Sequence, residues 1–177
     1  MKRILLAGFG GQGILFTGKF IAYAGMLEGK EVTWLPAYGA ESRGGTSNCH
    51  VIVSDEPIGS PLVLTPDILM CLNLPSLNKF EEAPEQNGTL YINSSLVSRE
   101  TTRKDVKAYY IPATELAFDN GMDGLANMIM LGVAIRESAV CGREIVSEAM
   151  KKVISERKKD MYDLNIKAIE FGFNYKG

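Results

Sequence analysis

The sequence predicts an α/β fold, a single domain with a Rossmann-like, mostly parallel sheet flanked by helices. Its first apolar run, residues 3–8, is nearly continuous, as in strands that are buried on both faces. A glycine turn, a helical repeat and a second short apolar run follow, which is the order of a βαβ unit. Strand-like and helix-like stretches continue along the chain, as in α/β folds. The length of 177 residues fits one core, so residues 1–177 are expected to form one domain.

The first half of the chain is expected to contain four strands and one helix. Residues 14–28 repeat at helical spacing, and Gly29 is a typical helix stop. Residues 32–35 form the second strand, and the run NCHVIVS, residues 48–54, forms the third. A turn-rich stretch ends that strand, and the apolar run DILMCL, residues 67–72, is expected to be a central strand.

The second half is expected to add two strands and then to change to a helical period. The runs GTLYIN and VKAYYIP, residues 88–93 and 106–112, are strand candidates. Helices are expected over residues 113–119, 125–137, 145–157 and 162–173. The second of these helices is almost wholly apolar and is expected to pack on the sheet, whereas the third is amphipathic with a charged exposed face.

The composition argues against several classes of protein. The net charge of −2 gives no sign of the basic face that nucleic-acid binding needs. The N-terminal apolar run is about six residues long, which is shorter than the roughly 7–15 residues of a signal-peptide core. No stretch approaches the ~18 apolar residues of a membrane span. We therefore expect a cytoplasmic protein that binds neither nucleic acid nor membrane.

The cysteines and the histidine are expected to be structural. Cys49, Cys71 and Cys141 are far apart, have apolar neighbours and form no C-x-x-C pair, which favours reduced, buried thiols. Iron–sulfur clusters usually need four cysteines, so this chain is not expected to hold one alone. The single histidine, His50, falls inside an expected strand without an obvious catalytic partner. We expect no catalytic residue and no metal ligand in this chain.

A glycine loop follows the first strand and supplies the first candidate site residues: Gly8, Gly10, Gly11, Gln12 and Gly13. The loop matches the G-x-G-x-x-G spacing, in which glycines allow a tight turn, a close ligand approach and close packing of helix on strand. Amide groups at a helix start favour an anion, and the Gln12 side chain offers both a donor and an acceptor. The alternative is a turn that only packs the strand-to-helix corner.

A dinucleotide site is disfavoured because the ribose-binding acid is missing. Such a site needs Asp or Glu at the end of the second strand, about 20 residues after the glycines. Here that strand ends in TWLPAYG; Glu28 and Glu31 come before it, and Glu41 lies in the next loop. The other phosphate-binding loop, G-x-x-x-x-G-K-[ST], is also absent.

A second glycine loop supplies the remaining candidates: Glu41, Ser42, Arg43, Gly44 and Gly45. It leaves the second strand at its carboxyl end, where open α/β sheets bind ligands. Paired glycines can expose successive N–H groups, and Arg43 can bind phosphate or carboxylate with two hydrogen bonds. The alternative is a solvated loop with an incidental Arg–Glu pair.

Four motifs, in order, resemble a known family. They are GFGGQGILFTGKFIAYA, YGAESRGGTSNCHVIVSDEPIGSP, PDILMCLNLPSLNKF and ANMIMLGVAI. Together they resemble the gamma subunit of 2-oxoacid:ferredoxin oxidoreductases, the family that acts on pyruvate, 2-oxoglutarate or 2-ketoisovalerate. The resemblance covers residues 2–149, and the first two motifs are the specific ones.

The resemblance implies CoA-acylating oxidative decarboxylation of a 2-oxoacid, with two electrons passed to ferredoxin. Such complexes use thiamine diphosphate, Mg and iron–sulfur clusters, and they contain catalytic alpha and beta subunits and a ferredoxin-like subunit. The E-x-R-G-G pattern of residues 41–45 is more similar to 2-oxoglutarate and branched-chain members than to pyruvate-specific ones.

The sequence assigns the reactive groups to other chains of such a complex. Residues 119–128, DNGMDGLANM, resemble a thiamine-binding metal motif only loosely, and we interpret them as a helix-start turn with Asn127 near the cap. We expect this chain to contribute an anion- or cofactor-contacting surface and an assembly surface. Two alternatives remain open, a ligand-free structural subunit and a stand-alone NAD-linked oxidoreductase. Residues 73–88 and 166–177 carry apolar side chains that fit either ordinary packing or subunit contacts.

Overall fold

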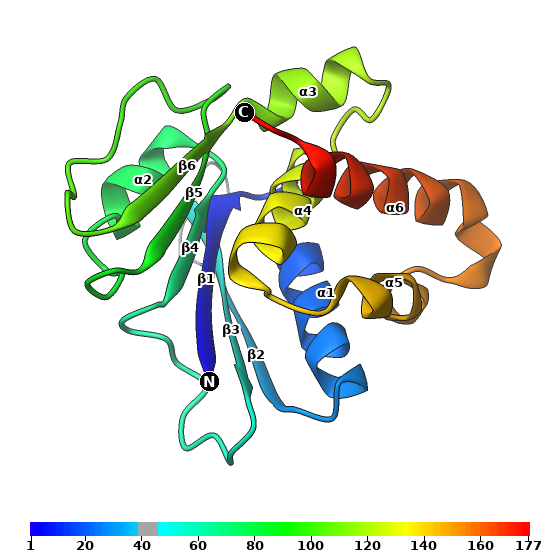
Figure 1. Ribbon diagram of the computed structural model, residues 1–177, viewed down its shortest axis with the longest axis horizontal. Coiled ribbons are helices and arrows are strands. Elements are labelled where there is room, and N and C mark those ends of the chain that lie inside the picture. Colours follow the sequence, from blue (N-terminus) through cyan, green and yellow to red (C-terminus); the bar gives the residue numbers. More distant parts are fainter. Residues whose placement is uncertain (39–45) are drawn as a thin grey trace.

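A six-stranded sheet forms the centre of the computed structural model, which describes residues 1–38 and 46–177 (Figure 1). The strands are β1 (Lys2–Phe9), β2 (Glu31–Tyr38), β3 (Thr46–Ser54), β4 (Ile68–Cys71), β5 (Thr89–Asn93) and β6 (Lys107–Ile111). The helices are α1 (Ile14–Leu27), α2 (Leu74–Phe80), α3 (Ala113–Asp119), α4 (Ala126–Ser138), α5 (Val146–Val153) and α6 (Lys159–Asn174). Short 3-10 turns, η1 (Arg143–Ile145) and η2 (Glu156–Lys158), precede the last two helices.

The strand order is β2-β3-β1-β4-β5-β6, and the sheet is mostly parallel, as predicted. β1, β4, β5 and β6 are parallel to one another, whereas β3 runs antiparallel to both of its neighbours, β1 and β2. The physical reason is the short connection between β2 and β3. A parallel connection needs a crossover of a dozen or more residues, and this one is shorter than that.

Helices cover the two faces of the sheet unequally. Figure 1 shows α1, α4, α5 and α6 on one side and α2 on the other. Successive side chains of β1 point to opposite faces: Ile4 and Leu6 belong to the larger core, and Leu5 belongs to the smaller core under α2. All three are almost fully buried, which explains why this strand is continuously apolar.

The α4 helix is the central element of the larger core. Every residue from 127 to 135 is buried, as expected for a helix that is apolar on all sides. It crosses α6 at a pair of glycines: a Cβ at Gly132 would lie 2.1 Å from the Ile169 carbonyl oxygen, and a Cβ at Gly172 would lie 1.9 Å from the Ile129 carbonyl oxygen. The two backbones can approach this closely only because both positions lack a side chain.

The bounds of three predicted elements differ most from those observed. The amphipathic helix expected over residues 145–157 ends at Val153, because Ile154 adopts an extended backbone before η2. The final helix begins at Lys159 rather than at residue 162. The second strand continues through Pro36, which β2 tolerates because it is an edge strand.

One helix, α2, has no counterpart among the predicted elements. Asn73 caps it by accepting a 2.9 Å hydrogen bond from the Ser76 N–H, and Pro75 occupies its first turn. The stretch Asn-Leu-Pro-Ser is a typical helix start, so the signal is present in the sequence.

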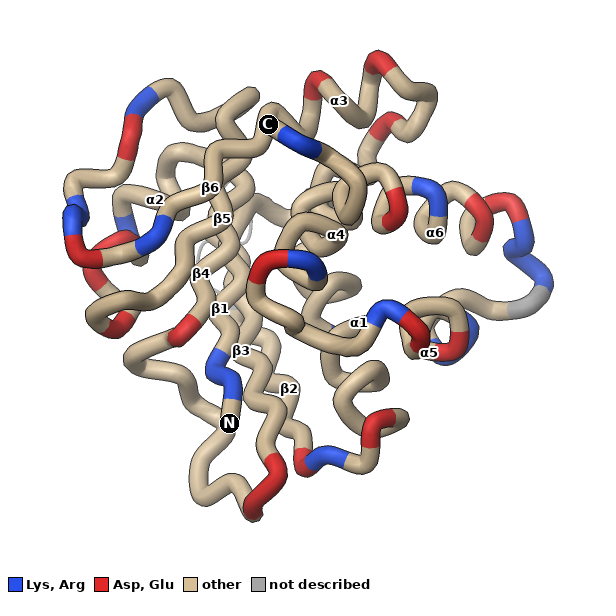
Figure 2. Tube along the Cα trace, viewed as in Figure 1, with Lys and Arg blue, Asp and Glu red and all other residues tan. Residues whose placement is uncertain are grey.

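Charged residues lie mainly outside the sheet. Figure 2 shows basic and acidic residues interspersed along the outer helices and loops, with the central strands nearly free of them. No helix in the described part of the chain has the length and apolar character that a membrane span requires.

Candidate functional site

The glycine loop connects the carboxyl end of β1 to the start of α1. Gly11 and Gly13 have positive φ angles of 91° and 77°, in the left-handed region that favours glycine. No side chain caps α1, and its first turn contains no acidic residue. The positive end of this 14-residue helix therefore lies at the carboxyl edge of the sheet. No carboxylate in the first turn of α1 neutralises it.

Gln12 folds back into the loop instead of presenting its whole amide outward. Its Oε1 accepts a 2.7 Å hydrogen bond from the Phe9 N–H and a 2.8 Å hydrogen bond from Asn73 Nδ2. Gly8 provides the space, because a Cβ at that position would lie 2.8 Å from Gln12 Oε1. The carbonyl oxygen is thus used within the protein. Within residues 1–38 and 46–177 the Gln12 Nε2 group has no hydrogen-bond partner, so only the donor half of the amide is available to a ligand.

Asn127 supports the other end of the loop. Its Nδ2 donates to the Gly13 carbonyl oxygen at 3.3 Å and to Thr17 Oγ1 at 3.0 Å. A Cβ at Gly13 would lie 2.3 Å from the same Nδ2. Asn127 does lie in the first turn of α4, as expected, but its side chain fixes the start of α1 rather than capping its own helix.

The glycines of the loop therefore serve two purposes. Gly8 and Gly13 make room for the amides of Gln12 and Asn127. A Cβ at Gly10 or Gly11, by contrast, would have no atom within 4 Å among the described residues. The open part of the loop is thus residues 10 and 11, beside the Gln12 donor.

The second glycine loop, with Glu41, Ser42, Arg43, Gly44 and Gly45, lies outside the described residues. Its flanking strand β3 is paired with β1, where Ser47 lies opposite Gly8 and Thr46 lies opposite Phe9. The first loop follows β1 and the second precedes β3, so the two loops are joined to adjacent strands at the same edge of the sheet. The Nζ of Lys79, on α2, donates a 3.2 Å hydrogen bond to Thr46 Oγ1 and adds a cation at this edge.

Sequence reasoning missed the contributions of Asn73 and Lys79. Asn73 directly follows the strand predicted over residues 67–72, and Asn before Leu-Pro is a recognisable helix cap. Its contact with Gln12 joins residues 61 positions apart, which no local pattern indicates. Lys79 had no signal beyond its charge.

The strand order disfavours a nicotinamide dinucleotide. In dinucleotide-binding folds the second strand lies directly beside the first, and its terminal acid reaches the ribose. Here β3 lies between β1 and β2. The ends of β1 and β2 are therefore two strand spacings, roughly 10 Å, apart.

The three cysteines are free and buried, as predicted. Burial raises the pKa of Cys49 and that of Cys141 to about 12, and it also raises the pKa of Cys71. These thiols are therefore poor nucleophiles and poor metal ligands near neutral pH. In the described part of the chain, no group of three or more His, Cys, Asp or Glu residues could hold a metal ion.

His50 is a buried structural residue. Its Nδ1 accepts a 3.2 Å hydrogen bond from the Val63 N–H, which ties the segment after β3 to the sheet. Burial lowers the pKa of the imidazole below its ordinary value of 6.5.

The buried imidazole predicts a loss of stability in mild acid. Because its pKa is lower in the folded protein, the unfolded chain binds the proton more readily, and unfolding becomes easier as the pH falls below about 6.5. The melting temperature should therefore fall between pH 7.5 and 5.5. His50→Asn keeps an acceptor near the Nδ1 position but does not titrate, so it should show a smaller fall. Equal pH dependence of the two proteins would contradict this prediction.

The two expected contact segments are largely explained by packing. In residues 73–88, Leu77 is fully buried in the smaller core, and Leu74 and Phe80 are half-buried against it. Phe173, near the C-terminus, is likewise half-buried against the larger core.

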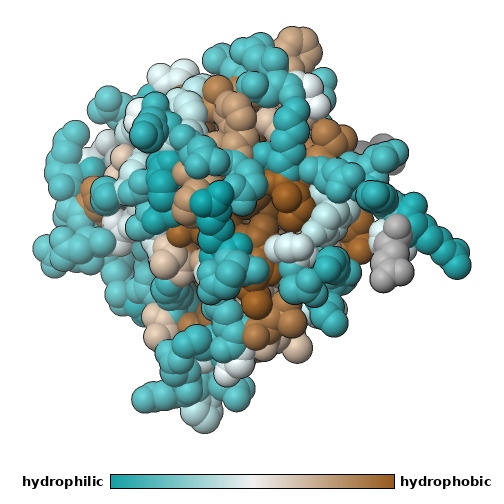
Figure 3. Space-filling view, turned by 45° about the vertical axis from the view of Figure 1, so that its right-hand side comes forward, coloured by the Kyte–Doolittle hydropathy of each residue, from teal (hydrophilic) through white to brown (hydrophobic). Residues whose placement is uncertain are grey.

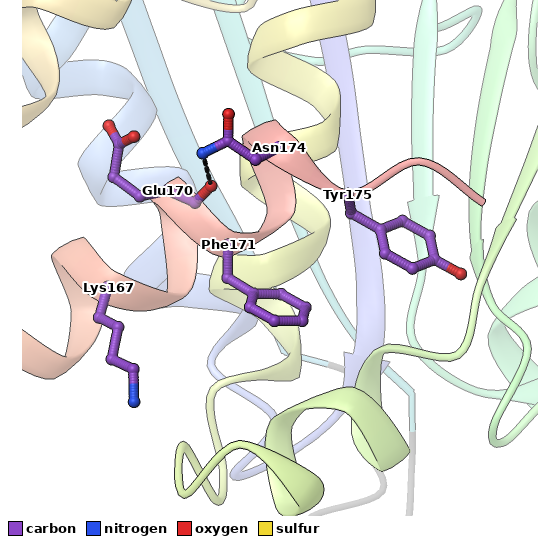
Figure 4. A pocket seen from close by; sticks show the side chains of 5 residues that line it. All are labelled: Lys167, Glu170, Phe171, Asn174 and Tyr175. Atoms are coloured by element: carbon purple, nitrogen blue, oxygen red, sulfur yellow. Dashed lines mark hydrogen bonds between the residues drawn. The ribbon is translucent and has the colours of Figure 1, made fainter.

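The C-terminal segment also borders a shallow surface cavity of about 400 Å³. Figure 4 shows its lining residues projecting from one stretch of α6 and its end: Lys167, Glu170, Phe171, Asn174 and Tyr175. Asn174 Nδ2 donates to the Glu170 carbonyl oxygen at 2.8 Å, so part of the lining is held by the helix itself.

The helical side of the molecule also exposes apolar surface. Figure 3 brings this side forward and shows hydrophobic residues near its middle, bordered by hydrophilic ones. Exposed apolar surface of this kind is typical of contacts between proteins.

Comparison with known proteins gives consistent matches along the chain. The family model described as pyruvate ferredoxin/flavodoxin oxidoreductase matches residues 3–175. A ketoisovalerate oxidoreductase subunit VorA from Methanothermobacter thermautotrophicus is 40% identical over 96% of this chain and 35% of that protein. The chain thus spans about a third of that relative. A 2-oxoglutarate synthase subunit KorC from Methanocaldococcus jannaschii is 34% identical over 97% of this chain and 92% of that protein.

A solved structure shares the whole architecture. The keto/oxoacid ferredoxin oxidoreductase gamma subunit from Geobacter sulfurreducens PCA is similar with a TM-score of 0.84 and 26% sequence identity. The match covers 98% of this chain and 96% of that subunit.

Proposed function

The chain belongs to the pyruvate ferredoxin/flavodoxin oxidoreductase family, and we propose that it is the gamma subunit of a multi-subunit 2-oxoacid:ferredoxin oxidoreductase. The complex would convert a 2-oxoacid and coenzyme A into an acyl-CoA and carbon dioxide and pass two electrons to ferredoxin. The observation that carries this proposal is the family match over residues 3–175, combined with the similarity to the KorC subunit and to the solved gamma subunit, both of which the chain covers almost completely.

In this proposal the reactive groups lie on partner chains. Thiamine diphosphate with Mg would supply the carbanion chemistry, and iron–sulfur clusters on other subunits would carry the electrons. This chain would contribute a surface for assembly with alpha, beta and ferredoxin-like subunits. Its own polar groups would bind and orient, as phosphate-contacting groups generally do.

We propose that the two glycine loops together contact an anionic part of a cofactor. Support comes from the uncapped start of α1, the open backbone at Gly10 and Gly11, and the Gln12 Nε2 donor, which has no hydrogen-bond partner among the described residues. Arg43 would add a guanidinium at the same edge of the sheet, because its loop precedes β3. Coenzyme A is the first candidate ligand and thiamine diphosphate the second. The alternative, a subunit that binds no ligand, shares the fold but lacks this contact.

We propose 2-oxoglutarate as the preferred substrate. The E-x-R-G-G pattern and the four similar 2-oxoglutarate synthase subunits support it. Ketoisovalerate is the second candidate, because the 40%-identical relative is named for that substrate.

Copurification with the partner chains, followed by a dye-reduction assay, tests the function. The tagged chain should carry thiamine-binding and iron–sulfur subunits with it. The purified complex should reduce a viologen dye only when both a 2-oxoacid and coenzyme A are present, and fastest with 2-oxoglutarate. Turnover by the isolated chain, or tight binding of a nicotinamide nucleotide to it, would contradict the proposal.

A further inference from the structure

We propose that Asn73 is a positioning residue that acts through Gln12, holding its amide so that the NH₂ group faces the ligand. The glycine loop would then be a donor site that selects phosphate or diphosphate oxygens. This inference rests on the proposed function of the loop, and it adds a residue outside both glycine loops.

The orientation of both amides follows from backbone donors. A backbone N–H can only donate, so the Gln12 atom that lies 2.7 Å from the Phe9 nitrogen must be the oxygen. By the same reasoning, the Asn73 atom that lies 2.9 Å from the Ser76 nitrogen must be its oxygen. Asn73 therefore presents its NH₂ group to Gln12 at 2.8 Å. Donors and acceptors match at every step of this chain of hydrogen bonds.

The reverse orientation of Gln12 is unfavourable on both sides. A turned amide would place its NH₂ group against the Phe9 N–H and against the Asn73 NH₂ group, so that donors would face donors. Asn73 is 2% exposed and is itself held by the first turn of α2. The α2 helix thus sets the direction of the Gln12 donor, although it lies on the opposite side of the sheet from α1 (Figure 1).

The resulting site suits an acceptor that carries negative charge. The Gln12 donor lies beside the open backbone at Gly10 and Gly11 and at the uncapped start of α1. Lys79 adds positive charge at the same edge. Coenzyme A and thiamine diphosphate both carry diphosphate oxygens, so the chemistry is shared and the experiment must separate the two sources.

The test uses the assembled complex with substitutions in this chain alone. Asn73→Ser removes the donor to Gln12 but keeps an oxygen that can cap α2. Gln12→Ala removes the proposed ligand donor. Each variant should raise the half-saturation concentration of one ligand, coenzyme A or thiamine diphosphate, by about tenfold. The half-saturation concentrations of the other ligand and of the 2-oxoacid should keep their wild-type values, and the ligand that responds is the one contacted.

Asn93→Ser is the matched control. Asn93 is also a buried asparagine at the carboxyl end of a neighbouring strand, but its Nδ2 donates to Thr114 Oγ1 at 2.8 Å and to the Leu72 carbonyl oxygen at 3.3 Å, and not to the glycine loop. Both ligand constants should keep their wild-type values in this variant.

A double variant separates positioning from general structural damage. If Asn73 acts through Gln12, Asn73→Ser should change the ligand constant less than twofold in the Gln12→Ala background. A full tenfold effect in that background would overturn the proposal. So would Asn73→Ser complexes with wild-type constants for both ligands.

Gln12→Glu tests the proposal without changing Asn73. The carboxylate can accept both inward hydrogen bonds but presents an oxygen instead of an NH₂ group to the ligand, so binding should weaken by more than tenfold. Wild-type binding would overturn the donor assignment, even if Asn73→Ser failed to assemble. Failure of the proposed function has another signature: the wild-type complex would turn over no 2-oxoacid, or Gln12→Ala would leave both ligand constants unchanged.

Discussion

Gly172→Ala is expected to lower the free energy of unfolding by about 3 kcal/mol, although alanine favours helices by about 1 kcal/mol over glycine. The new Cβ would lie 1.9 Å from the Ile129 carbonyl oxygen and 2.8 Å from the Ile129 carbonyl carbon. These atoms belong to the backbone of α4, so no side-chain rotation relieves the contact. The helices would have to separate by more than an ångström to reach an ordinary contact distance of about 3.4 Å. That separation would open the most extensive helix contact of the larger core.

Denaturant unfolding of the isolated chain measures this effect as a lower midpoint with an unchanged slope. Gly132→Ala should behave similarly, because its Cβ would lie 2.1 Å from the Ile169 carbonyl oxygen. Gly59→Ala is the control. Gly59 is exposed, and a Cβ there would have no described atom within 4 Å, so its change should stay within ~0.5 kcal/mol. A wild-type midpoint for Gly172→Ala would show that the helices do not cross this closely.

Much of the fold could be predicted because it is recorded in local patterns. The continuous apolar run of β1 and the wholly apolar α4 each indicate burial on all sides, and both are confirmed. The direction of β3 was available from the short connection that precedes it, but its position between β1 and β2 depends on pairing between distant segments. That insertion is what distinguishes this sheet from a dinucleotide-binding one.

The candidate site was predictable in its location but not in its internal contacts. The spacing of the glycines placed a loop between β1 and α1, as observed. The sequence did not show that Gly8 and Gly13 leave space for the side-chain amides of Gln12 and Asn127. The partners, Asn73 and Asn127, are 61 and 114 residues away from the groups they contact, so the meaning of each glycine depends on tertiary structure.

Gly13→Ala is expected to destabilise the fold, whereas Gly10→Val is expected to leave its stability nearly unchanged. At Gly13 an alanine would adopt a φ of 77°, which costs roughly 1–2 kcal/mol, and its Cβ would displace the buried Asn127 amide 2.3 Å away. The free energy of unfolding should fall by about 3 kcal/mol in total. Gly10 has neither a positive φ nor any described atom within 4 Å of its Cβ position, so Gly10→Val should change stability by less than ~0.5 kcal/mol.

Although Gly10→Val should hardly change stability, it should weaken ligand binding. If an anionic cofactor approaches the open backbone of the loop, the branched side chain of Gly10→Val lies in its path. In the assembled complex it should raise the half-saturation concentration of coenzyme A or of thiamine diphosphate about tenfold, a loss of ~1.4 kcal/mol. Gly10→Ala, with a smaller side chain, should show a smaller rise. If Gly10→Val complexes bind both cofactors like wild type, the open glycines face solvent or a partner chain instead of a ligand, and the loop contributes to assembly alone.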